Sequence, residues 1–327
     1  MHRCLLHFSL LLTFLLAACG PQAATNPLAT TATPPAPTVT PAPTLPPTPV
    51  ASPTPPPPAA LEAGALIDIG GRALFLRCTP PGNPAVPTVI LEAGLAADHS
   101  SWGEVPARAA SYARVCSYDR ASLGQSDPGP PPRDAATAAA DLRALLEAAG
   151  VPGPYILVAH SFGGLLARRF VAENPDLVAG LVLVDAVHED WWSLALAALP
   201  PESASDSPRL QSFRRFLTSD VADPARNAEG FVIPTVAEQA RASGSLGTKP
   251  LVVLSAGIFD VVAPGLPPEV EARLRELFQQ ELPAELGRLS ADSTVVVVPD
   301  SGHNIPRQRP DMVVLAIQAV LAAVAQA

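Results

Sequence analysis

A serine between a predicted strand and a predicted helix is the clearest candidate for chemistry in this sequence. Ser161 follows the apolar run Tyr155-Ile156-Leu157-Val158, which is typical of a buried strand, and precedes an apolar-periodic stretch typical of a helix. Small residues stand two positions away on each side, at Ala159 and Gly163. So tight a turn excludes bulky neighbours and pushes the serine hydroxyl out above the end of the sheet. The pattern therefore predicts that Ser161 is a nucleophile.

The sequence around Ser161 resembles the α/β-hydrolase superfamily over nearly the whole chain after residue 60. The matching stretches occur in the superfamily's order, and they are Val89–Gly94 (VILEAG), Tyr118–Asp127 (YDRASLGQSD), Leu181–Asp185 (LVLVD) and Ser301–His303 (SGH). They are most similar to a bacterial branch with Leu-Glu-Ala-Gly after the third strand and Tyr-Asp-Arg after the fourth. The resemblance implies a serine hydrolase of the α/β class, with a doubly wound, mostly parallel eight-stranded sheet and a small helical cap.

The apolar runs agree with this expectation, because strands that alternate with helices form a parallel sheet covered on both faces. We expect an opening hairpin over 66–79 and strands at 88–92, 114–118, 155–159, 180–185, 250–255 and 294–298. Ligands of such sheets bind beyond the carboxyl ends of the strands, where every motif above lies. The insertion at about 187–248 should fold as a helical cap. Its Trp191 and Trp192 are candidate substrate-binding residues, with the core of the cap as the alternative role.

A nucleophilic serine needs a base, and a carboxylate must orient that base. The resemblance places the base at His303, after the eighth strand. It offers two positions for the acid. Asp260 lies after the seventh strand in a Gly-x-x-Asp-x-x-x-Pro pattern, and Asp185 ends the sixth strand. We favour Asp260, since its glycine and its proline stand at the expected offsets, and we keep Asp185 as the alternative acid.

Two backbone amides should stabilise negative charge on the substrate oxygen. The resemblance assigns this oxyanion hole to the amide of Phe162, at a helix N-terminus that favours anions, and to the amide of Leu95. Three charged residues near these positions are expected to be structural. Glu92 should be a buried, hydrogen-bonded carboxylate, while Asp119 and Arg120 should brace their loop through an ion pair.

The N-terminal region predicts export and anchoring. Residues 1–18 combine a basic start, a short apolar run and small residues before Cys19, as in a lipoprotein signal peptide. By resemblance to bacterial lipoproteins, Cys19 is the lipidation site and carries acyl chains such as palmitate; an ordinary signal peptide with a chance cysteine is the alternative. Residues 19–60 are rich in Pro and Thr and should form an extended linker to a hydrolase domain at 61–327.

Two cysteines remain for the folded domain, because Cys4 lies in the signal peptide and Cys19 is assigned to the lipid. Cys78 and Cys116 lie on the predicted second and fourth strands, which are sheet neighbours in the resembled fold. A disulfide is therefore expected between them in an oxidising compartment, with two buried free thiols as the alternative.

Composition and motifs limit the function further. A formal net charge of −9 without a basic run argues against nucleic-acid binding. We find no metal-ligand motif or nucleotide-binding glycine loop and expect no cofactor. The predicted function is hydrolysis of small carboxylic esters through an acyl-enzyme, by a protein lipid-anchored outside the cytoplasm at a bacterial membrane or cell surface. Amide, lactone or thioester hydrolysis is an alternative, as is a surface-tethered binding protein without turnover.

Overall fold

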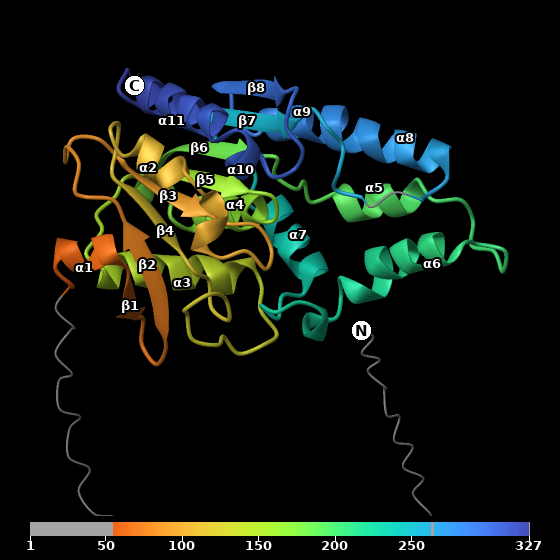
Figure 1. Ribbon diagram of the computed structural model, residues 1–327, viewed down its shortest axis with the longest axis horizontal. Helices are drawn as coiled ribbons and strands as arrows, with labels where there is room; N and C mark the ends of the chain where they lie inside the picture. Colours follow the sequence, from red (N-terminus) through yellow and green to blue (C-terminus); the bar gives the residue numbers. More distant parts are fainter. Residues whose placement is uncertain (1–54, 263–264, 327) are drawn as a thin grey trace, which may run out of the picture. The chain divides into compact units, whose positions relative to one another are not determined.

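The computed structural model of the protein describes residues 55–262 and 265–326 (Figure 1). The predicted signal peptide, Cys19 and the predicted linker up to residue 54 lie outside these described residues. The described chain contains one eight-stranded sheet of order β1-β2-β4-β3-β5-β6-β7-β8. Its strands are β1 (Ala65–Asp68), β2 (Ala73–Cys78), β3 (Thr88–Glu92), β4 (Val115–Tyr118), β5 (Tyr155–His160), β6 (Val178–Val184), β7 (Leu251–Ala256) and β8 (Ser293–Val298).

The sheet is antiparallel only at its β1 edge. β1 pairs with β2 and β2 pairs with β4 in antiparallel fashion, whereas all pairs from β4 to β8 are parallel. The observed strand ends differ from the expected ones by at most two residues. The predicted fold class, a doubly wound and mostly parallel eight-stranded sheet, is therefore confirmed.

Helices cover both faces of the sheet. The α-helices are α1 (Pro58–Ala63), α2 (Val105–Ala109), α3 (Ala135–Ala148), α4 (Gly163–Glu173), α5 (Trp191–Ala197), α6 (Pro208–Arg215), α7 (Ile233–Ala242), α8 (Pro268–Glu276), α9 (Leu282–Gly287), α10 (Ile305–Gln308) and α11 (Pro310–Val324). Short 3₁₀ or π turns are η1 (His99–Trp102), η2 (Pro175–Leu177), η3 (Phe216–Asp220), η4 (Pro224–Arg226) and η5 (Leu277–Glu281). None of these described helices is both long and apolar enough to cross a membrane.

Alternate residues of the central strands pack into two separate hydrophobic clusters. Val89 and Leu91 of β3 pack with residues of α2 and α11, while Ile90 between them packs with residues of α3 and α4. Side chains of a strand alternate between faces, so a strand buried on both faces is a continuous apolar run. Figure 1 shows α2 and α11 on one side of the sheet and α3 on the other.

The folded domain begins slightly before the expected position. Helix α1 starts at Pro58, inside the segment predicted as linker, and its Leu61 is buried in the same cluster as residues of α3 and α4.

The two residues of the predicted disulfide are also in place. Cys78 and Cys116 are register partners on β2 and β4, and their sulfur atoms are bonded.

The cap is built from two segments of chain. Between β6 and β7 the structure has the expected helices α5, α6 and α7, of which α7 packs on α4. The segment after β7 also contributes, because Leu274 of α8 and Phe278 of η5 share a hydrophobic cluster with Trp191 and Phe213. In Figure 1, α5, α6 and α8 project beyond the carboxyl ends of the parallel strands.

Candidate active site

Ser161 lies on the sharp turn between β5 and α4. Its φ of 55° is in the left-handed region, which few non-glycine residues adopt. Its N–H donates to the carbonyl of Val184 at 3.1 Å. A Cβ on Gly163 would lie 2.5 Å from the carbonyl oxygen of Ala93, so only glycine lets α4 begin this close to β3. The methyl group of Ala159 is accommodated in the core.

Ser161, His303 and Asp185 form one hydrogen-bonded chain. His303 follows β8, and its Nε2 lies 2.9 Å from Oγ of Ser161. Its Nδ1 lies 2.6 Å from Oδ2 of Asp185. A carboxylate on Nδ1 fixes the tautomer of the ring and leaves Nε2 free to accept the serine proton.

The structure contradicts our preference for Asp260 as the carboxylate on Nδ1. Oδ1 of Asp260 accepts the backbone N–H of His303 at 2.7 Å, and its side chain is exposed. Asp185 directly follows β6, the neighbour of the serine strand, and its side chain is only 1% exposed. Because the amide of Ala256 binds Oδ1 of Asp185, the other oxygen faces the imidazole. The loop after β7 instead directs Asp260 to the main chain.

The two amides expected to form the oxyanion hole lie beside Ser161. Phe162 is the N-cap residue of α4, and Leu95 lies in the loop after β3. A Cβ built on Gly94 would be 3.3 Å from Cβ of Ser161, so this loop lies against the serine. Within the described chain, neither the Leu95 nor the Phe162 amide donates a hydrogen bond to another protein group. Both are therefore available to a substrate oxygen.

Comparisons with known proteins agree with this architecture. A family model described as alpha/beta hydrolase fold matches residues 87–231. The uncharacterized protein YqjL of Bacillus subtilis (strain 168) is 28% identical over 239 residues, which are 73% of this chain and 85% of YqjL. A thermophilic esterase from Thermogutta terrifontis superposes with a TM-score of 0.51 at 23% identity, covering 80% of this chain and 98% of the esterase. A loop variant of the haloalkane dehalogenase DbeA from Bradyrhizobium elkanii gives a TM-score of 0.57 at 16% identity, covering 80% and 99%. This chain is an α/β-hydrolase-fold protein.

Two side chains contact His303 without having been predicted to do so. Nε2 of His160 donates to the carbonyl oxygen of His303 at 2.9 Å. Burial, together with the nearby His303, lowers the pKa of His160 to about 3, so His160 is neutral at neutral pH. The ring of Phe278 packs edge-on against His303, with 5.9 Å between centroids. No motif surrounds Phe278 in the sequence that would indicate this contact.

The two candidate substrate-binding tryptophans differ in position. Trp191 is buried in the cap cluster, where it packs edge-on against Phe278 at 5.2 Å between centroids. Trp192 is partly buried and packs both on the cap cluster and on the cluster that contains Phe162. Trp191 is thus part of the core of the cap. Trp192 lies between the cap and the residue that follows the nucleophile.

The charged residues near β3 and β4 are paired differently than expected. Arg120 forms no ion pair with Asp119 but contacts Glu92 and Glu229. Glu92 is buried and hydrogen-bonded, as predicted, and burial raises its pKa. Glu229 was missed because it lies 109 residues away from Arg120 in sequence. A buried arginine does require a carboxylate partner, but that requirement alone does not identify which one.

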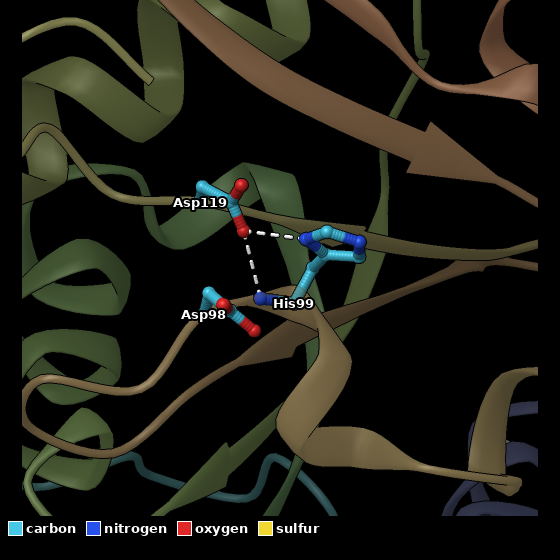
Figure 2. A group of neighbouring side chains, drawn as sticks. All are labelled: Asp98, His99 and Asp119. Carbon is cyan, nitrogen blue, oxygen red and sulfur yellow. Dashed lines mark hydrogen bonds and ion pairs between the residues drawn. The ribbon is translucent and has the colours of Figure 1, made fainter. Parts of the chain in front are cut away.

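Asp119 instead holds the loop that carries His99 (Figure 2). Its Oδ1 accepts both the backbone N–H of His99, at 2.8 Å, and Nδ1 of that ring, at 2.6 Å. Its Oδ2 accepts the N–H of Gln125. Candidate metal-ligand atoms of Asp98, His99 and Asp119 lie within 4.8 Å of one another. Because Nδ1 of His99 and Oδ1 of Asp119 are already hydrogen-bonded to each other, we interpret the cluster as a structural link between two loops.

Proposed function

We propose that the protein is a serine hydrolase of carboxylic esters. The observation that carries the proposal is the hydrogen-bonded chain of hydroxyl, imidazole and buried carboxylate formed by Ser161, His303 and Asp185. Such a chain activates a hydroxyl group that is otherwise a poor nucleophile. The amides of Leu95 and Phe162 add the electrostatic stabilisation that acyl transfer requires.

The proposed reaction has two halves. Oγ of Ser161 attacks the ester carbonyl and gives its proton to Nε2 of His303, while the carbonyl oxygen becomes negative beside the amides of Leu95 and Phe162. The tetrahedral intermediate then expels the alcohol, which takes the proton from Nε2. A water molecule attacks the acyl-enzyme with the same base, releasing the acid and restoring Ser161.

The nucleophile argues for ester chemistry over the halide displacement named for the dehalogenase relative. The fold alone does not separate the two, since both neighbours superpose over 80% of this chain. Displacement of a halide on this fold uses a carboxylate nucleophile, whereas position 161 is serine. Phe278 against His303 and Trp192 between the cap and Phe162 favour esters with an apolar acyl or alcohol group.

We further propose that the enzyme acts outside the cytoplasm, held to a bacterial membrane by lipid on Cys19. Support comes from the pattern of residues 1–19 and from the Cys78–Cys116 disulfide, which requires an oxidising compartment.

Turnover of an ester panel by wild type and Ser161→Ala tests the proposed chemistry. Loss of the nucleophile should reduce kcat by a factor on the order of 10⁴ or more. The melting temperature should stay close to that of the wild type, because the hydroxyl is not part of the core. A Ser161→Ala protein that hydrolyses the same esters at the wild-type rate would refute the proposal.

A further inference from the structure

The peptide unit between Gly94 and Leu95 has two functions at once. Its N–H is the Leu95 donor assigned to the proposed oxyanion hole, and its carbonyl belongs to Gly94. Because a trans peptide is planar, its C=O and N–H point in opposite directions. Whatever holds the Gly94 carbonyl therefore sets the direction of the Leu95 donor.

Arg120 holds that carbonyl more closely than the turn itself does, in which the N–H of Ala97 donates to the Gly94 oxygen at 3.2 Å. Nη2 of Arg120 donates to the Gly94 oxygen at 2.6 Å, and Nη1 donates to the Ala93 oxygen, also at 2.6 Å. Two consecutive carbonyls of the loop are thus bound by one planar guanidinium, whose fork is rigid. A cation on the carbonyl also polarises the peptide and strengthens its N–H as a donor.

Glu229 in turn holds both Arg120 and the far end of the loop. Its carboxylate accepts hydrogen bonds from Nε of Arg120 at 2.6 Å and from Nη2 at 2.8 Å, so the two side chains form a bidentate pair. Oε1 of Glu229 also accepts the N–H of Ala96 at 2.8 Å. Ala96 has a φ of 57°, a conformation that persists only where its surroundings hold it.

Burial makes this pair of charges interdependent. Arg120 is 3% exposed and Glu229 is 1% exposed. Burial alone would lower the pKa of Arg120, but the Glu229 carboxylate raises it above its ordinary value, so the guanidinium stays charged. Glu229 lies between η4 and α7, within the insertion between β6 and β7. The insertion that forms most of the cap therefore reaches the loop that carries the Leu95 amide.

We infer that Glu229 and Arg120 are positioning residues that keep the Gly94–Leu95 peptide in the orientation that binds the oxyanion. The inference rests on the proposed ester hydrolysis. It adds that the orientation of the Leu95 N–H depends on a residue of the cap insertion. Both side chains are buried, and we assign neither a contact with substrate. Their effect passes through the peptide, so it should appear in transition-state binding and not in substrate binding.

Glu229→Gln is the direct test, because it keeps the size of the side chain and removes its charge. Full removal of an oxyanion donor costs about 10²–10³ in kcat, so misorientation should cost about tenfold to a hundredfold, with KM within about threefold. Affinity for a trifluoromethyl ketone, which forms a tetrahedral adduct with the serine, should fall by a similar factor.

Glu189→Gln is the matched control. Glu189 is buried and lies in the same insertion as Glu229. It makes a bidentate ion pair with Arg168 of α4, not with the loop after β3. Its loss should lower the melting temperature yet leave kcat and ketone affinity within about threefold of wild type. If Glu229→Gln fails to fold, Arg120→Lys provides the same test, since lysine keeps the charge and loses the fork.

The outcomes separate the two proposals. Wild-type kcat and ketone affinity in Glu229→Gln would overturn the positioning role, while an inactive Ser161→Ala would leave the hydrolase proposal standing. An equal loss of kcat in Glu189→Gln would also overturn the positioning role, because the effect would be general destabilisation. A folded wild type without ester turnover would overturn both.

Discussion

Two carboxylates flank His303, and they hold different atoms of it. Asp185 accepts a hydrogen bond from Nδ1 of the ring, and Asp260 accepts one from the backbone N–H. Asp185→Asn should favour the wrong tautomer and reduce kcat by about 10⁴, as in other triads. Asp260→Asn keeps an amide oxygen that can accept the same N–H. Even complete loss of that hydrogen bond would cost about 1 kcal/mol, which is less than about tenfold in rate.

Kinetics of the two variants on one ester, with matched melting curves, decide between the two roles. If Asp260→Asn instead showed the larger loss, the relay through Asp185 would be wrong.

Single residues with a strict local requirement could be predicted from the sequence. Ser161 and His303 are placed by short patterns next to strands, and the structure brings them into contact. The preference for Asp260 over Asp185 was wrong, because both residues follow a strand end and only the path of the loop decides which carboxylate oxygen contacts the ring. Glu229 was missed for a related reason, since its contacts depend on the fold of the whole insertion.

Elements with a strong period or a continuous apolar run were predictable to within one or two residues. β3, for instance, occupies 88–92 as expected, because both of its faces are buried and its run is uninterrupted. The contribution of α8 and η5 to the cap was not predictable. Their apolar residues indicate amphipathic helices, but the partner of such a face is a tertiary property.

The Cys78–Cys116 bond joins β2 to β4 at the antiparallel edge of the sheet, and its removal should destabilise the domain. The bond closes a loop with a sequence separation of 38, which in the chain-entropy account corresponds to roughly 3–4 kcal/mol of unfolding free energy. We expect Cys78→Ala/Cys116→Ala to unfold at a lower urea concentration than the oxidised wild type. The expectation fails if the two midpoints coincide, or if both wild-type thiols alkylate fully without reductant.

For the whole molecule, the proposed lipid anchor predicts where the chain partitions. Expressed in a bacterium that processes lipoproteins, the wild type should enter the detergent phase of a Triton X-114 separation. Cys19→Ala removes the proposed site of acylation and should shift the protein to the aqueous phase, since two or more acyl chains provide stable anchoring. Equal partitioning of the two proteins would argue against lipid on Cys19.

The proposed function depends on one oxygen atom, Oγ of Ser161. Labelling that atom tests the account most directly. A fluorophosphonate reacts only with an activated serine, so peptide mass spectrometry of the labelled wild type should find one adduct per chain, on Ser161. Folded Ser161→Ala should carry none. No adduct on a folded wild type, or an adduct on another residue that persists in Ser161→Ala, would contradict the proposed hydrolase.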